Sequence, residues 1–205
     1  MARWEPDARG RLEKAAMELF QERGYAHTTV GDIAARADLT ERTFFRYFTD
    51  KREVLFSGAK ELEQGIVERI AGAPQGVPPL AAVAAAFEAA GAELEQRRDL
   101  DHVRARYGLV IKHAEIQERE LIKLASLARA TTSALHARGV SEPTASLAAE
   151  AGIAVFKIGF ERWVNDKQPC DLAGHIRAAM DALRTVTAGT ATPKARAKKK
   201  QARRA

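Results

Sequence analysis

Apolar residues recur at helical spacing along most of the chain, and no alternation of period two is sustained. Such spacing places apolar side chains on one face of a helix, so the sequence predicts an all-α fold of about nine helices, without strands. A first helix begins at Asp7 or Pro6, and Gly24 ends it. Its buried face consists of Leu12, Ala15, Ala16, Leu19 and Phe20.

The stretch 28–56 predicts two short helices joined by a tight turn. Thr29 and Asp32 form a capping box at the start of the first helix, and Thr40 can cap the second. Asp38 stands in the turn, where one residue favours a positive φ. Two helices joined in this way form a helix-turn-helix, whose second helix enters the major groove of DNA.

The start of that second helix carries groups that can read base edges. Arg42 can bind guanine O6 and N7, Glu41 can accept a hydrogen bond from cytosine N4, and Thr43 can contact a thymine methyl. Basic and hydroxyl side chains nearby can hold phosphates. We therefore expect a DNA interface made of Thr29, Gly31, Thr40, Glu41, Arg42, Thr43, Phe45, Arg46, Tyr47 and Lys51.

This stretch resembles the TetR family of one-component transcriptional regulators, in its AcrR-like subgroup. The resemblance rests on T-T-V-x-x-I-A-x-x-A at 28–37, on T-F-F-x-Y-F at 43–48, and on Lys51 at the start of the following helix. The family favours glycine where Asp38 stands. It favours tyrosine where Phe45 stands, so a hydroxyl that often binds phosphate in the family is missing here.

Beyond the helix-turn-helix, the apolar pattern predicts a series of longer helices. The first, over 51–71, is opened by a capping box of Asp50 with Glu53. Residues 72–79 then form a break that contains three prolines and two glycines. The helix over 141–165 is apolar on more than one face, so it needs two partners, its own core and another chain. The other helices are expected over 80–97, 100–113, 116–137 and 171–186.

The resemblance implies a repressor that binds a palindromic operator on double-stranded DNA, dimerises through its last two helices and is released by a small molecule. The expected domains are a helix-turn-helix DNA-binding domain at 1–52, a helical ligand-binding and dimerisation domain at 53–187, and a disordered basic tail at 188–205. Two alternatives remain open. One is a DNA-associated architectural protein of low sequence specificity; the other is a helical enzyme or interaction domain with an incidental three-helix start.

A ligand pocket is expected among the helices between residues 80 and 165, because the resemblance implies one and a helical bundle can open between its helices. The candidate lining is largely apolar, which suits a hydrophobic or aromatic ligand, and His102 and Arg106 could supply polar contacts. For any single member, a place in the ordinary core is the stronger interpretation. The candidates are Phe87, Gly91, His102, Arg106, Tyr107, Val110, Ile111, Phe156, Phe160 and Trp163.

Composition limits the remaining possibilities. The formal net charge of +6 arises in the tail, where seven basic residues and no acid follow Ala188. The single Cys170 excludes a disulfide within one chain and fits a protein of the reducing cytoplasm. No apolar run approaches the ~20 residues of a membrane span, and no signal-peptide core is present. Because the five histidines lack metal-ligand spacing and no phosphate loop or nucleophile motif occurs, we expect no metal, no cofactor and no enzyme.

Overall fold

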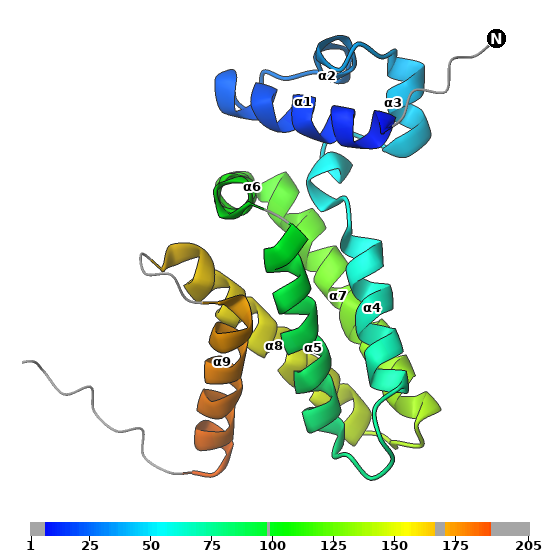
Figure 1. Cartoon of the computed structure of the whole chain (residues 1–205), viewed down its shortest axis with the longest axis vertical. Coiled ribbons are helices and arrows are strands. Elements are labelled where there is room, and N and C mark those ends of the chain that lie inside the picture. Colours follow the sequence, from blue (N-terminus) through cyan, green and yellow to red (C-terminus); the bar gives the residue numbers. More distant parts are fainter. Residues whose placement is uncertain (1–6, 98, 167–170, 190–205) are drawn as a thin grey trace, which may run out of the picture.

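The computed structural model describes residues 7–97, 99–166 and 171–189, and all regular structure in these residues is helical (Figure 1). This confirms the predicted all-α fold for the described part of the chain. The N-terminal bundle, α1–α3 with the 3-10 helix η1, stacks on the C-terminal bundle, α4–α9. The elements are α1 (Ala8–Glu22), α2 (Val30–Arg36), α3 (Glu41–Tyr47), η1 (Glu53–Phe56), α4 (Ala59–Ala71), α5 (Pro79–Arg97), α6 (Leu100–Lys112), α7 (Ala114–Ala137), α8 (Thr144–Asn165) and α9 (Leu172–Thr187).

Short-range hydrogen bonds fix the helix ends of the N-terminal bundle. The Thr29 hydroxyl accepts from the Asp32 amide, and the Asp32 carboxylate accepts from the Thr29 amide at 2.9 Å, so the predicted capping box is confirmed. Thr40 caps α3 as predicted, because its hydroxyl accepts from the amide of Thr43 at 3.2 Å. Asp38 has a φ of 54°, the positive value expected in the turn.

The segment between the two bundles is not the single helix predicted over 51–71. Asp50 accepts hydrogen bonds from the amides of Arg52 and Glu53, which close a tight turn and open η1. The Glu53 carboxylate does not return to this turn; it pairs with Arg119 and Lys123 on α7, so the predicted second capping box is wrong. Gly58, at a φ of 88°, then separates η1 from α4.

The C-terminal bundle surrounds a second core, in which α8 is the central helix. Helix α8 packs against α5, α7 and α9, while α4 lies against α5 and α7. Glycines allow two of these close approaches. A Cβ on Gly152 would lie 2.3 Å from Val83 Cγ1 on α5, and a Cβ on Gly159 would lie 3.0 Å from the Ile176 backbone on α9. Fully buried side chains of this core include Ile66, Ile70, Val83, Phe87, Leu135, Leu172 and Ile176.

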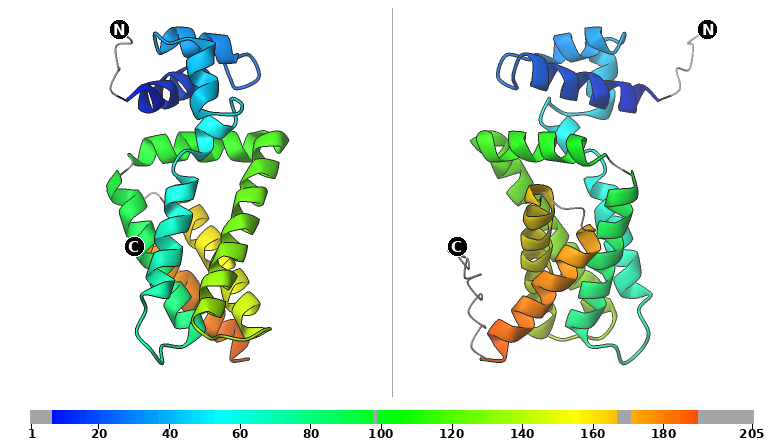
Figure 2. Two further views of the ribbon diagram at one scale, coloured as in Figure 1. Left: turned by 90° about the vertical axis from the view of Figure 1, so that its right-hand side faces the viewer. Right: turned by 60° about the vertical axis from the view of Figure 1, so that its left-hand side comes forward.

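Helix α6 lies across the top of the C-terminal bundle, directly beneath the N-terminal bundle (Figure 2). Val110 on α6 and Ile116 on α7 belong to the same buried cluster as the core residues of α1–α3. The ring of Tyr25 also lies 5.0 Å from that of His113, at the corner between α6 and α7. The two bundles therefore share apolar contacts, and η1 is not their only connection.

Candidate functional site

One face of α3 is buried and the other is open to solvent. Phe44 is 0% exposed and anchors the helix, whereas Phe45 and Tyr47 are 54% and 41% exposed. Arg42 is exposed and makes no hydrogen bond or ion pair with the described residues. Arg46 is also exposed and donates to the Tyr47 hydroxyl at 3.0 Å. The outer face thus presents guanidinium groups and aromatic rings that are exposed and take no part in the core.

The N-terminus of α2 lies beside the N-terminus of α3. A Cβ on Gly31 would lie 2.8 Å from Oε1 of Glu41, so glycine leaves room for that side chain. The Thr29 hydroxyl also contacts the Asp32 carboxylate at 2.6 Å, and the Thr43 hydroxyl lies 3.0 Å from that of Thr40. The structure therefore brings the candidate DNA-contacting residues of α2 and α3 together on one surface.

Lys51 differs from the other candidates because its ammonium group is engaged within the protein. Its Nζ donates to the backbone carbonyls of Tyr25 at 2.8 Å and Thr28 at 3.0 Å, and lies 4.3 Å from the centre of the Tyr25 ring. Burial raises the pKa of the Tyr25 hydroxyl well above its ordinary value. Lys51 thus holds the loop between α1 and α2, a role the sequence pattern did not indicate.

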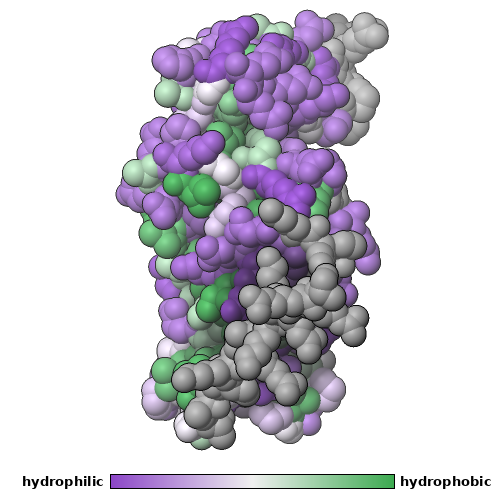
Figure 3. Space-filling view, turned by 90° about the vertical axis from the view of Figure 1, so that its left-hand side faces the viewer, coloured by the Kyte–Doolittle hydropathy of each residue, from purple (hydrophilic) through white to green (hydrophobic). Residues whose placement is uncertain are grey.

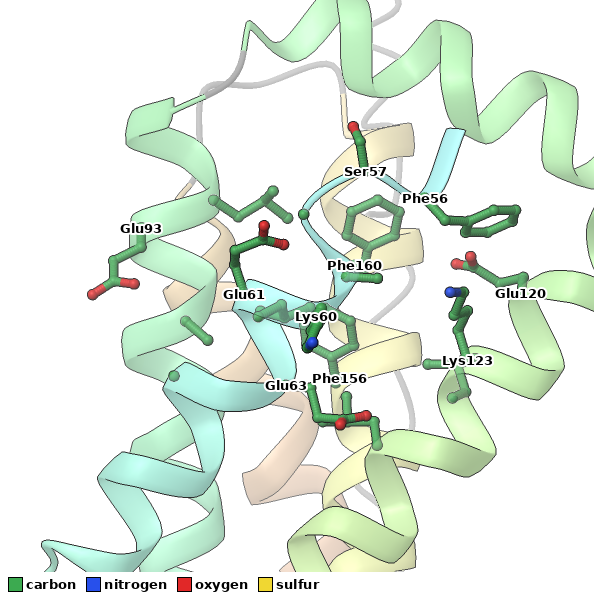
Figure 4. A pocket seen from close by; sticks show the side chains of 18 of the residues that line it. Phe56, Ser57, Lys60, Glu61, Glu63, Glu93, Glu120, Lys123, Phe156 and Phe160 are labelled. Atoms are coloured by element: carbon green, nitrogen blue, oxygen red, sulfur yellow. The ribbon is translucent and has the colours of Figure 1, made fainter. Parts of the chain in front are cut away.

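A cavity of about 500 Å³, partly open to solvent, lies in the C-terminal bundle (Figure 4). Its walls come from α4, α5, α6, α7 and α8, and the segment Leu55–Leu62, which joins the two bundles, forms a further wall. Phe156 and Phe160 of α8 lie between α4 and α7, with their rings stacked 6.1 Å apart. The apolar part of the lining also includes Ala90, Leu94, Val103, Leu124 and Leu127.

Most charged groups of the cavity wall are paired with one another or with neighbours. Arg106 pairs with Glu120 at 2.7 Å, and Arg69 pairs with Glu93. The Glu63 carboxylate accepts a hydrogen bond from the Ser126 hydroxyl at 3.1 Å. Because these polar groups already have partners, the surface left to contact a ligand is mainly apolar and aromatic.

Two wall residues also hold the connection between the bundles. Arg106 donates to the backbone carbonyl of Leu55 at 2.6 Å, and its guanidinium lies 5.1 Å from the centre of the Phe56 ring. Lys123 pairs with Glu53 at 3.2 Å. Burial raises the pKa of the Glu53 carboxyl, but hydrogen bonds from Arg119 and Lys123 outweigh it and leave that pKa below its ordinary value. Displacement of either wall residue would therefore disturb η1.

The residues predicted to line a pocket are spread over several environments. His102, Arg106, Phe156 and Phe160 line the cavity. The others are not part of this lining. Phe87, Tyr107 and Trp163 pack behind it, against Phe156 or Phe160, with ring centres 5.5–6.0 Å apart.

The remaining three candidates point elsewhere. Gly91 faces α9, where its Cβ would lie 2.7 Å from the Ile176 side chain, so a larger residue there would push on α9 instead of narrowing the cavity. Val110 lies in the core of the N-terminal bundle, and Ile111 is 57% exposed. Sequence reasoning missed the wall formed by Leu55–Leu62, for which the isolated Gly58 was the available signal.

Metal ligation and membrane insertion find no support in the residues described. None of the groups of histidine, cysteine, aspartate and glutamate side chains among residues 7–97, 99–166 and 171–189 could hold a metal ion. No helix in the same ranges is long and apolar enough to cross a membrane. Cys170 and the basic tail beyond Gly189 lie outside the described residues, so the predictions for both remain predictions.

Comparison with known proteins agrees with the helix-turn-helix. The family described as bacterial regulatory proteins, tetR family, matches residues 12–57. The HTH-type transcriptional regulator TcmR of Streptomyces glaucescens is 38% identical over 81 residues, which cover 40% of this chain and 36% of TcmR. The chain thus matches little more than a third of that relative's length.

Solved structures of similar fold extend over nearly the whole chain. A crystal structure of Thermus thermophilus FadR, a TetR family transcriptional repressor in complex with lauroyl-CoA, has a TM-score of 0.54 at 24% identity and covers 92% of this chain and 98% of its own. A putative TetR-family regulator from Syntrophomonas wolfei has a TM-score of 0.64 at 19% identity, with 91% and 98% covered. Residues 12–57 of this chain thus match the tetR family of bacterial regulatory proteins, and the chain as a whole shares its fold with solved TetR-family structures.

Proposed function

We propose that this protein is a transcriptional repressor that binds a palindromic DNA operator as a homodimer and leaves it when a small molecule binds. The observation that carries the proposal is the outer face of α3. Phe44 fixes the helix in the core, while Arg42, Phe45 and Arg46 project into solvent. A helix held in this way can enter a major groove about 12 Å wide without disturbing the bundle behind it.

Within this proposal, the residues at the start of α3 read the bases. Glu41 and Arg42 are exposed there, with Thr43 beside them, and can meet base edges. Arg46 and the Tyr47 hydroxyl bind phosphate, and Thr29 and Gly31 line the approach from α2. Lys51 supports the loop between α1 and α2 instead of contacting DNA directly, since both of its carbonyl partners lie there.

The proposed dimer pairs α8 and α9 of two copies. These helices carry exposed apolar side chains, namely Leu147 at 66%, Ile158 at 47% and Val186 at 70% exposure. On the face in Figure 3 the top of the molecule is mostly hydrophilic, and hydrophobic surface appears in separate patches lower down. Dimerisation would place the two α3 helices about 34–36 Å apart or somewhat more, to fit successive major grooves.

The proposed ligand is a largely apolar or aromatic small molecule bound in the cavity. A volume of about 500 Å³ falls within the usual range for such sites, and stacked phenylalanine rings suit a flat apolar surface. The likeness in fold to FadR, whose structure is a complex with lauroyl-CoA, supports a small-molecule ligand. Because Leu55–Leu62 forms a wall of the cavity and joins the two bundles, a ligand that displaces this wall would also shift the N-terminal bundle.

The test combines selection of DNA sites, light scattering and ligand titration. Selection from random duplexes should yield a palindrome bound about a thousandfold more tightly than random DNA, whereas an architectural protein would show no such preference. Light scattering should give a dimer at micromolar protein, and a monomer would contradict the proposed interface. A ligand that weakens operator binding tenfold must itself bind the DNA complex tenfold more weakly, about 1.4 kcal/mol. Ligands that stabilise free and operator-bound protein equally would exclude induction.

A further inference from the structure

The turn that sets the direction of α3 lacks the glycine that its geometry favours. Asp38 has a φ of 54°, in the left-handed region that few side chains adopt, and its own side chain is 98% exposed. The backbone bonds of this turn run from the Asp38 amide to Ala35 at 3.0 Å and from the Leu39 amide to Ala34 at 2.9 Å. Within the described residues, no backbone amide outside the helices donates to the carbonyls of Ala37 or Asp38.

Arg11 of α1 supplies the donors that the backbone does not. Its Nη2 donates to the carbonyl of Ala37 and, at 3.4 Å, to that of Asp38. The same atom lies 3.9 Å from the Asp38 carboxylate. The neighbouring Leu12 is 0% exposed, so α1 is a rigid base for this contact. A planar guanidinium suits the task, because one group can donate to several closely spaced oxygens in a fixed geometry.

We propose that Arg11 is a positioning residue that holds the turn between α2 and α3 and thereby sets the angle at which α3 meets DNA. Arg11 is 26 residues from Ala37 and 27 from Asp38 in sequence, so its hydrogen bonds link α1 to the turn that precedes α3. The part of this inference that concerns DNA rests on the proposed function; the part that concerns the turn does not.

A direct phosphate contact by Arg11 is the competing explanation, and the two differ in what they predict. A phosphate contact adds about 0.9 to the dependence of log affinity on log salt, and it acts equally on all sequences. A residue that holds the turn leaves the salt dependence unchanged. Its loss instead weakens the preferred site more than random DNA, because only base readout depends on the angle of α3.

The experiment compares Arg11→Met, which keeps an unbranched side chain but removes its donors, with Arg9→Met in the same chain. Arg9 is the matched control, because it lies on the same helix and its partners, Glu13, Glu61 and the ring of Phe48, lie outside the turn. The first measurement needs no DNA. Hydrogen exchange of the Leu39 amide should become about tenfold faster in Arg11→Met, which corresponds to about 1.4 kcal/mol, and should stay unchanged in Arg9→Met.

The second measurement is the affinity for the selected operator and for random DNA across a salt series. Arg11→Met should bind the operator about tenfold more weakly, with an unchanged salt slope and little change on random DNA. Adding Asp38→Gly should restore much of the loss, because glycine adopts the turn geometry without support. A change in salt slope with normal exchange at Leu39, or no change in either measurement, would overturn the proposal. A wild-type protein without a preferred site would refute the proposed function alone, since exchange would still decide the role of Arg11 in the turn.

Discussion

Replacing Gly152 by alanine should destabilise the protein, although alanine is the better helix former. Gly152 lies where α8 crosses α5, and an added Cβ would sit 2.3 Å from Val83 Cγ1 and 3.3 Å from Phe87 Cε2. Both neighbours are 0% exposed, so neither can move into solvent. The methyl group can be accommodated only if the two helices separate or if these side chains leave their preferred rotamers.

The size of the effect follows from two opposing contributions. Overpacking of a filled core costs about 1–3 kcal/mol, and replacement of a helical glycine by alanine returns up to about 1 kcal/mol. Since a 2.3 Å contact is severe, we expect a net loss of about 1–2 kcal/mol. For a chain of this size, that loss should lower the denaturation temperature by about 2–8 °C.

Gly108→Ala is the matched control for this prediction. Gly108 lies inside α6, and its Cβ would meet no atom within 4 Å, so only the gain in helix propensity applies. Thermal unfolding followed by circular dichroism, at one protein concentration because an oligomer's stability depends on it, should move the two variants in opposite directions. Equal or increased stability of Gly152→Ala would show that α5 and α8 are not as closely packed as described.

Three further predictions concern single side chains. Arg42→Ala should weaken operator binding by about 1–3 kcal/mol and relax the preference at one base pair; titration against single-base variants tests this, and a uniform loss would instead mark a phosphate contact. Glu53→Gln should be less stable than wild type at neutral pH. Because folding lowers the pKa of Glu53, its carboxylate stabilises the folded state above the ordinary pKa of about 4.3, and this stabilisation is lost as the pH falls through the folded pKa. The denaturation curves of the two proteins should therefore converge in acid. A gap that stays constant with pH would contradict this. Thr131→Val should stabilise by about 1 kcal/mol, because the buried Thr131 hydroxyl has no hydrogen-bond partner among the described residues; a lower denaturation temperature would count against that.

Local features of the fold could be predicted because their causes lie within a few residues of one another. The capping box of Thr29 with Asp32 spans three residues, and the cap of Thr40 on Thr43 does the same. The positive φ of Asp38 could be expected because the tight turn of a helix-turn-helix favours one such residue. The apolar spacing likewise gave the ends of α5 to α9 to within a few residues, since each long helix must bury one face.

Features that depend on distant parts of the chain could not be read in this way. The helix predicted over 51–71 breaks at Gly58, and Glu53 faces away from its own helix, because its partners Arg119 and Lys123 are 66 and 70 residues away. The cavity shows the same limit. An apolar side chain at helical spacing must be buried, but the spacing does not say whether it meets a filled core or an open space.

The sequence by itself therefore determined most of the helices, the caps at Thr29 and Thr40, and the composition of the outer face of α3. Only the tertiary structure decided that Gly91 packs on α9, that Leu55–Leu62 lines the cavity, and that Arg11 holds the turn before α3. The physical reason is the distance along the sequence over which each interaction acts. Backbone conformation and capping are set by neighbours in sequence, whereas a cavity or a contact between helices is set by how whole faces meet, which no short stretch of sequence contains.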